Sequence, residues 1–323
     1  MTLRVIHPGL QSSIQDLGRR GFQRFGLSVS GAADKYALRF GNLLLGNPLN
    51  AAGIETTLLG LELEILGDCT VAVTGGDLGL QVDHNPAATW RVLNLQAGQR
   101  LHFTGGPKGC RAYVCVQGGI DVPMQYGSRS TDALVGLGGL NGRELRAGDV
   151  ISANLHFVGA QNKTAHLARR LVSPRWVPRY EKEQTVHVIL GPQEAAFTQE
   201  AVETLLGSPY RVSPQSNRIG CHLEGPFLQH KIGADILSEC VPEGAIQVPS
   251  SGNPLILLAG RRGIGGYTKI ATVAGVDIPK VAQSRPGDRL FFKAVTVEQA
   301  QSWWMEQERF FKCAESVLCS PLS

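Results

Sequence analysis

The sequence predicts a mainly β chain with a few helices, organised as two related halves. Most apolar segments are short, alternate in polarity or are rich in β-branched residues, and they end at Gly, Pro or Asp, which is typical of strands. Strands and helices do not alternate along the chain, so a parallel, doubly wound sheet is not expected and barrels or sandwiches fit better. A repeated motif supports the division into halves.

Strand patterns recur along the whole chain. They are found at residues 3–7, 61–66, 70–75, 91–95, 100–104, 111–118, 186–190, 245–249, 255–259, 269–275 and 289–295. Helix patterns are fewer. Residues 32–45 place their apolar side chains on one face and precede Gly46, a stop signal. Residues 194–206 precede Gly207, and a Thr-x-x-Gln capping box predicts a third helix that begins at Thr296.

The repeat relates two segments that lie about half a chain apart. Residues 109–123, GCRAYVCVQGGIDVP, align with residues 265–279, GGYTKIATVAGVDIP, at an offset of 156 residues. Such self-similarity predicts a duplicated structural unit. We therefore expect an N-terminal domain at 1–161, a polar, basic linker at 162–184 and a C-terminal domain at 185–323.

Composition and charge argue against several classes of protein. The net charge is +4 and the basic residues are spread along the sequence, which does not predict a nucleic-acid partner. No run of about 18 apolar residues predicts a membrane span, and the N-terminus lacks the apolar core of a signal peptide. The seven cysteines form no Cys-x-x-Cys pair and no His pair has metal spacing. We expect a cytoplasmic protein with reduced thiols, no membrane attachment and no metal site.

Residues 15–34, QDLGRRGFQRFGLSVSGAAD, combine glycines and arginines directly before the first helix pattern. Arginine forks bind carboxylates and phosphates, and the N–H groups at a helix N-terminus bind anions, so this loop is a candidate anion site. The alternative is structural, with Arg19 and Arg24 paired to Asp16 and Asp34. The residues alone leave both interpretations open.

Four more segments gather polar side chains: GSRSTD (127–132), SPQSNRIG (213–220), IQVPSSGNP (246–254) and GRRGIGGYTK (260–269). None contains the Gly-x-Ser-x-Gly elbow of a nucleophilic serine or the Gly-Lys-Ser/Thr end of a phosphate loop. No histidine lies within them, so a Ser-His-Asp triad is not predicted.

These motifs in combination resemble the biotin-dependent carboxyltransferase family. QDLGRRGFQRFGLSVSGAADKYALRFGNLLLGNP, GIETTLLGLELEI, AVTGGDL, GGIDVP with GSRSTD, SPQSNRIGCHLEG, GAIQVP with GNPLILL, and GGYTKIATV follow one another across nearly the whole chain. The family includes 5-oxoprolinase C subunits, formerly labelled allophanate hydrolase subunit 2, and one part of the urea carboxylase carboxyltransferase domain.

The resemblance implies a fold, an activity and partners. It implies two cyclophilin-like β-barrel domains, and a polypeptide that opens 5-oxoproline to L-glutamate with companion B and A subunits, at the expense of ATP and with Mg²⁺ in the assembled complex. The isolated chain is expected to be inactive. Arginines would bind phosphate or the substrate carboxylate, hydroxyls and amides would donate to a developing oxyanion, and carboxylates would manage a proton. At family-matched positions, the candidates are Asp16, Asp132 and Gln247 for catalysis and Arg19, Ser128, Arg129, Thr131, Asn217, Arg218 and Tyr267 for substrate or anion binding.

One segment departs from the family pattern. Where members usually carry Asp-x-Gln-Thr-Thr-Gly-Gly-Tyr-Pro, residues 260–268 read GRRGIGGYT. This difference keeps two alternatives open. One is a carboxyltransferase component that acts on a urea-like amide with carboxybiotin, which another protein would have to carry because this sequence lacks a Met-Lys-Met biotin acceptor. The other is a non-catalytic regulator that binds a partner protein.

Overall fold

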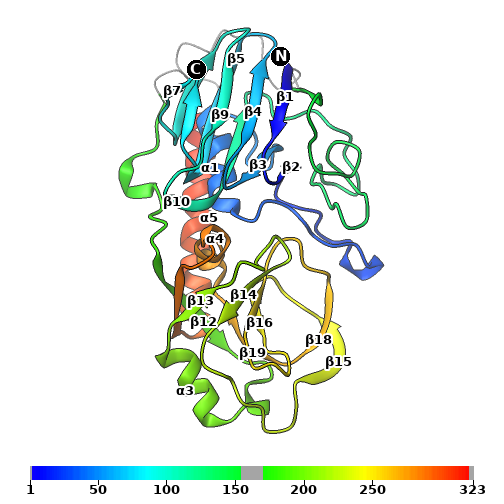
Figure 1. The fold of residues 1–323 in the computed structure, drawn as a ribbon, viewed down its shortest axis with the longest axis vertical. Helices are drawn as coiled ribbons and strands as arrows, with labels where there is room; N and C mark the ends of the chain where they lie inside the picture. The colour runs from blue at the N-terminus through cyan, green and yellow to red at the C-terminus, as the bar shows by residue number, and fades with distance from the viewer. Residues whose placement is uncertain (1, 154–169, 320–323) are drawn as a thin grey trace. The chain divides into compact units, whose positions relative to one another are not determined.

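The computed structural model describes residues 2–153 and 170–319, and strands dominate the described part of the chain (Figure 1). The mainly β fold class is confirmed. The chain divides into two compact units. The first comprises Met1–Arg20, Ser30–Arg179 and Phe311–Ser323, and the second comprises Gly21–Val29 and Tyr180–Phe310.

The first unit contains two antiparallel sheets around one hydrophobic core. The six-stranded sheet has the order β11 (Val150–Ser152), β1 (Thr2–Pro8), β4 (Leu61–Ile65), β9 (Arg100–Phe103), β6 (Leu80–Val82), β7 (Asn85–Pro86). The five-stranded sheet has the order β2 (Ser12–Gln15), β3 (Gly53–Thr57), β10 (Lys108–Val116), β5 (Cys69–Asp77), β8 (Arg91–Leu95). Val5 and Leu63 of the first sheet share the core with Val73 and Val114 of the second.

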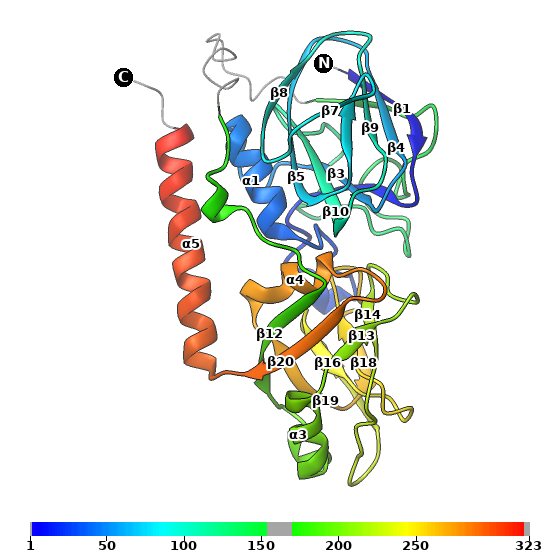
Figure 2. The same ribbon diagram turned by 60° about the vertical axis from the view of Figure 1, so that its left-hand side comes forward.

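Helix α1 (Lys35–Leu45) covers the other face of the five-stranded sheet, over β5 and β10 (Figure 2). The Thr74 hydroxyl of β5 donates to the Ala37 carbonyl of the helix at 2.7 Å. The helix begins three residues later than the predicted range, because Asp34 is its N-cap and accepts a hydrogen bond from the Ala37 N–H at 2.9 Å. Gly46 ends the helix in the left-handed conformation, as predicted.

The second unit is built around a closed barrel. Its strands follow the order β12 (Glu183–Leu190), β19 (Lys269–Val273), β16 (Ala245–Gln247), β17 (Leu255–Leu257), β14 (Gly220–Glu224), β13 (Tyr210–Val212), β20 (Arg289–Ala294). Parallel pairing of β12 with β20 closes the barrel, and Figure 2 shows these two strands side by side. A separate hairpin pairs β15 (Asp235–Cys240) with β18 (Ile264–Tyr267).

The helices of the C-terminal half begin at side-chain caps. The helix expected at 194–206 is split into a 3₁₀ turn, η4 (Glu194–Ala196), and α3 (Gln199–Gly207), because Thr198 caps α3 by accepting from the Ala201 N–H at 3.1 Å. The predicted capping box before α5 (Val297–Cys319) is confirmed by reciprocal bonds between Thr296 and Gln299 at 3.0 and 3.2 Å. The other short helices of the described residues are η1 (Gln23–Phe25), η3 (Pro174–Trp176), η5 (Gly275–Asp277) and α4 (Ile278–Gln283).

The two copies of the repeat each contribute a paired strand. The first copy contains most of β10, which lies between β3 and β5. The second copy contains β19, which lies between β12 and β16. The domain boundaries at 161/162 and 184/185 stay a prediction, and the first of them lies outside the described residues, as does the linker before residue 170.

Candidate functional site

The Asp16 carboxylate is the centre of a densely connected polar group in the first unit. Asp16 follows β2, and its Oδ1 accepts hydrogen bonds from the Gly18 N–H at 2.8 Å, the Ser128 hydroxyl at 2.7 Å and the Ser130 hydroxyl at 2.5 Å. Its Oδ2 accepts from the Arg129 N–H at 2.6 Å. The motifs at 15–34 and 127–132 therefore meet, although nothing in the sequence indicated that they lie together.

Arg19 lies beside this carboxylate and is completely buried, with 0% of its surface exposed. Its Nε donates to the Gln125 carbonyl at 3.2 Å and its Nη2 to the Ser130 carbonyl at 2.8 Å. Burial lowers the pKa of the guanidinium, against the opposing effect of Asp16 and Asp132. The structural alternative of ion pairs from Arg19 is therefore wrong in detail, since the bonds of this side chain go to backbone carbonyls.

Most of the other candidate side chains in this cluster make hydrogen bonds to the protein backbone. The Thr131 hydroxyl donates to the Ile14 carbonyl at 3.0 Å, and Asp132 accepts from the Leu134 N–H at 3.2 Å. The Nε of Arg129 donates to the Val122 carbonyl at 3.0 Å. The two terminal nitrogens of this half-buried Arg129 make no hydrogen bond to residues 2–153 and 170–319, so they are available to an anion.

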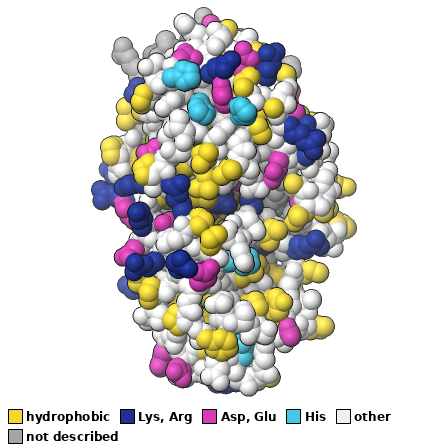
Figure 3. All heavy atoms as spheres, viewed as in Figure 1, with side chains coloured by type: hydrophobic (Ala, Val, Ile, Leu, Met, Phe, Trp, Pro, Cys, Tyr) yellow, Lys and Arg dark blue, Asp and Glu magenta, His cyan; other side chains and the backbone are white. Residues whose placement is uncertain are grey.

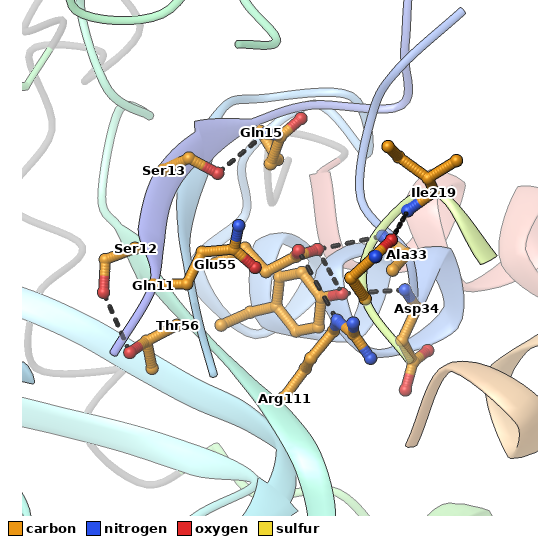
Figure 4. Close-up of polar contacts among 12 residues, drawn as sticks. Gln11, Ser12, Ser13, Gln15, Ala33, Asp34, Glu55, Thr56, Arg111 and Ile219 are labelled. Atoms are coloured by element: carbon orange, nitrogen blue, oxygen red, sulfur yellow. Dashed lines mark hydrogen bonds and ion pairs between the residues drawn. The ribbon is translucent and has the colours of Figure 1, made fainter. Parts of the chain in front are cut away.

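A second polar group covers the face of the five-stranded sheet beneath the start of α1 (Figure 4). Glu55 Oε2 accepts from the Ala33 N–H at 2.9 Å and the Tyr113 hydroxyl at 2.7 Å, and Tyr113 accepts from the Asp34 N–H at 2.7 Å. Arg111 lies 3.8 Å from the Glu55 carboxylate. Burial, followed by the charge of Glu55, raises the pKa of Tyr113 well above its ordinary value, so it is a neutral hydroxyl.

Gln15 bonds to the segment that carries the first group and lies on the same sheet face as the second, and sequence reasoning missed it. Ser13 and Gln15 project from β2 on the same face as Glu55, because Ser13 pairs directly with Glu55 in β3. The Gln15 Nε2 donates to the Ser13 hydroxyl at 2.8 Å and to the Thr131 carbonyl at 3.2 Å. The available signal was the position of Gln15 immediately before Asp16, in a segment too polar to read as a strand.

The remaining candidates lie in the second unit. Gln247 is buried and its Nε2 donates to the Tyr267 carbonyl at 3.4 Å, whereas the Tyr267 side chain is exposed. Asn217 Oδ1 accepts from the Ile219 N–H at 2.7 Å and from the Gly220 N–H at 3.3 Å, which holds the turn that carries Arg218. The functional roles of all the predicted site residues stay predictions.

The segment that departs from the family pattern also packs locally. A Cβ at Gly260 would lie 3.0 Å from the Arg218 carbonyl oxygen, which favours glycine here. Arg261 donates to the carbonyls of Val241 and Leu258, and burial lowers the pKa of its guanidinium. Ile264 is exposed.

Beside this segment, the second unit buries a lysine. The Lys269 ammonium on β19 bonds to Glu239 on β15, which also accepts from the Gln193 amide at 2.8 Å. These two hydrogen bonds lower the pKa of the exposed Glu239 carboxyl.

A search of the described residues finds no group of three His, Cys, Asp or Glu side chains placed to hold a metal ion. No described helix is both long enough and apolar enough to span a membrane. On the face shown in Figure 3, basic and acidic side chains are interspersed, in keeping with a net charge of +4.

Comparison with known proteins decides the family. The model of the carboxyltransferase domain, subdomain A and B, matches residues 25–294. The chain belongs to this carboxyltransferase family. The resemblance predicted from the motifs is therefore confirmed.

Proteins of two names are similar to this chain over most or all of its length. The 5-oxoprolinase C subunit of Escherichia coli K12 is 36% identical over 310 residues, which cover 96% of both chains. The protein of the same name from Haemophilus influenzae is 36% identical over 90% of both chains. The structure of Kluyveromyces lactis urea carboxylase superposes on all of this chain with a TM-score of 0.86 and 28% identity, and this chain covers 30% of it.

Proposed function

We propose that the chain is the C subunit of a cytoplasmic, ATP-dependent 5-oxoprolinase, which opens 5-oxoproline to L-glutamate together with companion A and B subunits. The observation that carries this proposal is the match to bacterial proteins of that name, at 36% identity over 96% of both chains for the Escherichia coli protein. The urea carboxylase, by contrast, is matched over 30% of its length.

The chemistry requires a site that activates an unreactive amide. The lactam of 5-oxoproline is stabilised by resonance, and transfer of a phosphoryl group from ATP to its carbonyl oxygen makes the carbon open to attack by water. This chain supplies donors for such a reaction. The free terminal nitrogens of Arg129 suit a carboxylate or phosphate, and the Asp16 cluster holds the loop that carries Arg129 in place.

The nucleotide is assigned to the assembled complex. The sequence has no phosphate loop of the Gly-Lys-Ser/Thr type. We assign the binding of ATP, and of the Mg²⁺ that accompanies it, to surfaces that the companion subunits help to form. We expect the isolated chain to hydrolyse neither ATP nor 5-oxoproline.

The test is to purify the chain alone and together with the products of its neighbouring genes, and to measure 5-oxoproline-dependent release of phosphate. Activity is expected only in the assembled complex, with glutamate and phosphate formed in equal amounts. Robust turnover by the single chain would refute its role as a dependent subunit. A complex that releases no phosphate with 5-oxoproline would refute the proposed substrate.

A second candidate is the carboxyltransferase component of a urea carboxylase. The observation that favours it is the superposition of the whole chain on the urea carboxylase of Kluyveromyces lactis. In this case carboxybiotin on another protein would donate its carboxyl group to a urea-like amide. Biotin-dependent carboxylation of urea by the complex, in place of 5-oxoproline-dependent phosphate release, would establish this second function.

A further inference from the structure

Two buried polar atoms beside the Asp16 cluster have no hydrogen-bond partner among the described residues. One is the Oε1 of Gln15 and the other is the Nη1 of Arg19. Their side chains are 1% and 0% exposed. A buried polar atom without a partner costs free energy, so two of them beside one cluster need an explanation.

The orientation of the Gln15 amide is fixed by its neighbours. The nitrogen faces the Thr131 carbonyl, which can only accept, so the end without a partner must be the oxygen. Arg19 is anchored one residue away, because its Nη2 donates to the Ser130 carbonyl. The two side chains are thus anchored to the carbonyls of consecutive residues, Thr131 for Gln15 and Ser130 for Arg19.

We propose that Gln15 and Arg19 recognise the edge of a cis amide, as presented by a lactam or by urea. In a ring amide the N–H and C=O groups lie on the same side, so one edge offers a donor to Gln15 Oε1 and an acceptor to Arg19 Nη1. This assignment rests on the proposed function and deepens it, because it names the residues that distinguish an amide substrate. It also serves the chemistry, since the Arg19 cation would offset the negative charge of the phosphoryl group that is transferred to the amide oxygen.

Entry to this position requires the loop around Gly138 to move. A Cβ at Gly138 would lie 2.7 Å from Arg19 Nη2 and only 2.0 Å from the Ser130 carbonyl oxygen, so the loop backbone closes directly over the guanidinium. Residue 138 has a φ of 71° and lies between other glycines at 136 and 139, a composition that permits rearrangement.

The first test compares 5-oxoproline with two analogues that lack the N–H group, N-methyl-5-oxoproline and the lactone 5-oxotetrahydrofuran-2-carboxylate. Binding to the assembled complex is measured by calorimetry. We expect the lactone to bind at least about tenfold more weakly than the lactam, because Gln15 Oε1 would face an oxygen instead of a donor. Equal binding of lactam and lactone would overturn the proposal and leave a bound water as the partner of the two atoms.

The second test uses Gln15→Met, with Gln11→Met as the matched control. Gln11 precedes the same strand, and its Nε2 donates to Glu144 at 2.6 Å. The ratio of lactam to lactone affinity should fall to near one in Gln15→Met and stay unchanged in Gln11→Met. A ratio preserved in Gln15→Met would overturn the proposal, and if this variant does not fold, the wild-type ratio still decides.

The same measurements separate this inference from the proposed function. Urea and 2-pyrrolidinone are included as ligands without a carboxylate. If the complex binds these cis amides and discriminates against N-methyl-2-pyrrolidinone, but 5-oxoproline elicits no phosphate release, the proposed function fails and the recognition by Gln15 and Arg19 stands. If 5-oxoproline elicits phosphate release but the complex binds lactam and lactone equally, the proposed function stands and the recognition by Gln15 and Arg19 fails.

Discussion

The Asp16 carboxylate of the first unit and the Lys269 ammonium of the second are both buried, but their surroundings differ. Asp16 accepts four hydrogen bonds, all from neutral donors: two backbone N–H groups and two hydroxyls. Lys269 relies on a carboxylate, Glu239, which is itself exposed on the β15–β18 hairpin. Several fixed dipoles of the scaffold therefore stabilise the charge of Asp16. A single opposite charge at the surface stabilises that of Lys269.

The difference predicts how each charge responds to change. The Asp16 carboxylate is the common acceptor of four hydrogen-bond donors. Its removal would therefore leave several buried polar atoms without partners. The buried lysine charge needs its carboxylate partner for stabilisation. The exposed carboxylate does not need the lysine, because water can hydrate it. The first arrangement suits a site that must keep its geometry, and the second suits the attachment of a hairpin to the barrel.

The largest effect is expected for Asp16→Ala. The variant leaves the Ser128 and Ser130 hydroxyls and the Arg129 N–H without their acceptor, and we expect the free energy of unfolding to fall by about 3 kcal/mol or more. Urea denaturation of the purified chain measures this change.

Asp121→Ala is the matched control for this prediction. Asp121 is an exposed aspartate of the same unit, and its replacement should alter stability by no more than about 0.5 kcal/mol. Equal stability of the two variants would show that the four short bonds to Asp16 contribute little, and that the contrast between the units is not energetic.

A smaller and unequal effect is expected from the two partners of the buried ion pair. Lys269→Met replaces a buried ammonium with an apolar chain of similar length and leaves only an exposed carboxylate, so stability should change by less than about 1 kcal/mol. Glu239→Gln keeps the size of the side chain but leaves the Lys269 charge buried without an acid, so it should be the more destabilising of the two.

Thermal unfolding of the two single variants and of the double variant measures this asymmetry. The double variant should resemble Lys269→Met, because the effect of Glu239→Gln depends on the lysine charge. A larger loss in Lys269→Met than in Glu239→Gln would contradict this account of the second unit.

Much of the fold was predictable from the sequence, but several strands were missed, among them β13, β14, β15 and β18 of the second unit and β2 and β3 of the first. Strands with apolar alternation, such as β1, β4 and β9, have observed bounds close to the predicted ones. β2 and β3 were missed because one face carries Ser13, Gln15 and Glu55, which are buried beside other polar groups. Polarity normally marks exposure, so their sequences resembled loops.

The sequence predicted which motifs form the candidate site, but not what each side chain in them contacts. The motifs around Asp16 and Ser128 do meet, although the two residues are 112 positions apart. Residue type alone could not reveal that the Ser128 and Thr131 hydroxyls are spent inside the scaffold, because their acceptors come from distant segments. Nor could it reveal that Arg19 is buried, since arginine is rarely enclosed without a paired carboxylate.

The smallest effect is expected from acid, and it should come from His230 in the second unit. This side chain lies against Phe197, and its Nε2 is 3.1 Å from the Val248 carbonyl and 3.0 Å from the Thr268 hydroxyl. Burial lowers the pKa of the ring below its ordinary value of 6.5, against weaker opposing effects of the Val248 hydrogen bond and Asp235. The folded chain therefore binds this proton less readily than the unfolded chain does. The contribution to stability is fully present above pH 6.5 and is lost as the pH falls from there through the folded-state pKa.

Replacement of the ring by an amide that does not titrate tests this acid response. His230→Gln retains a donor for Val248, so its unfolding midpoint in urea should decline less between about pH 7 and about pH 5.5 than that of the wild type. His7→Gln, at an exposed position of the first unit, should decline as the wild type does. If His230→Gln and the wild type decline in parallel, His230 is not the source of the acid sensitivity.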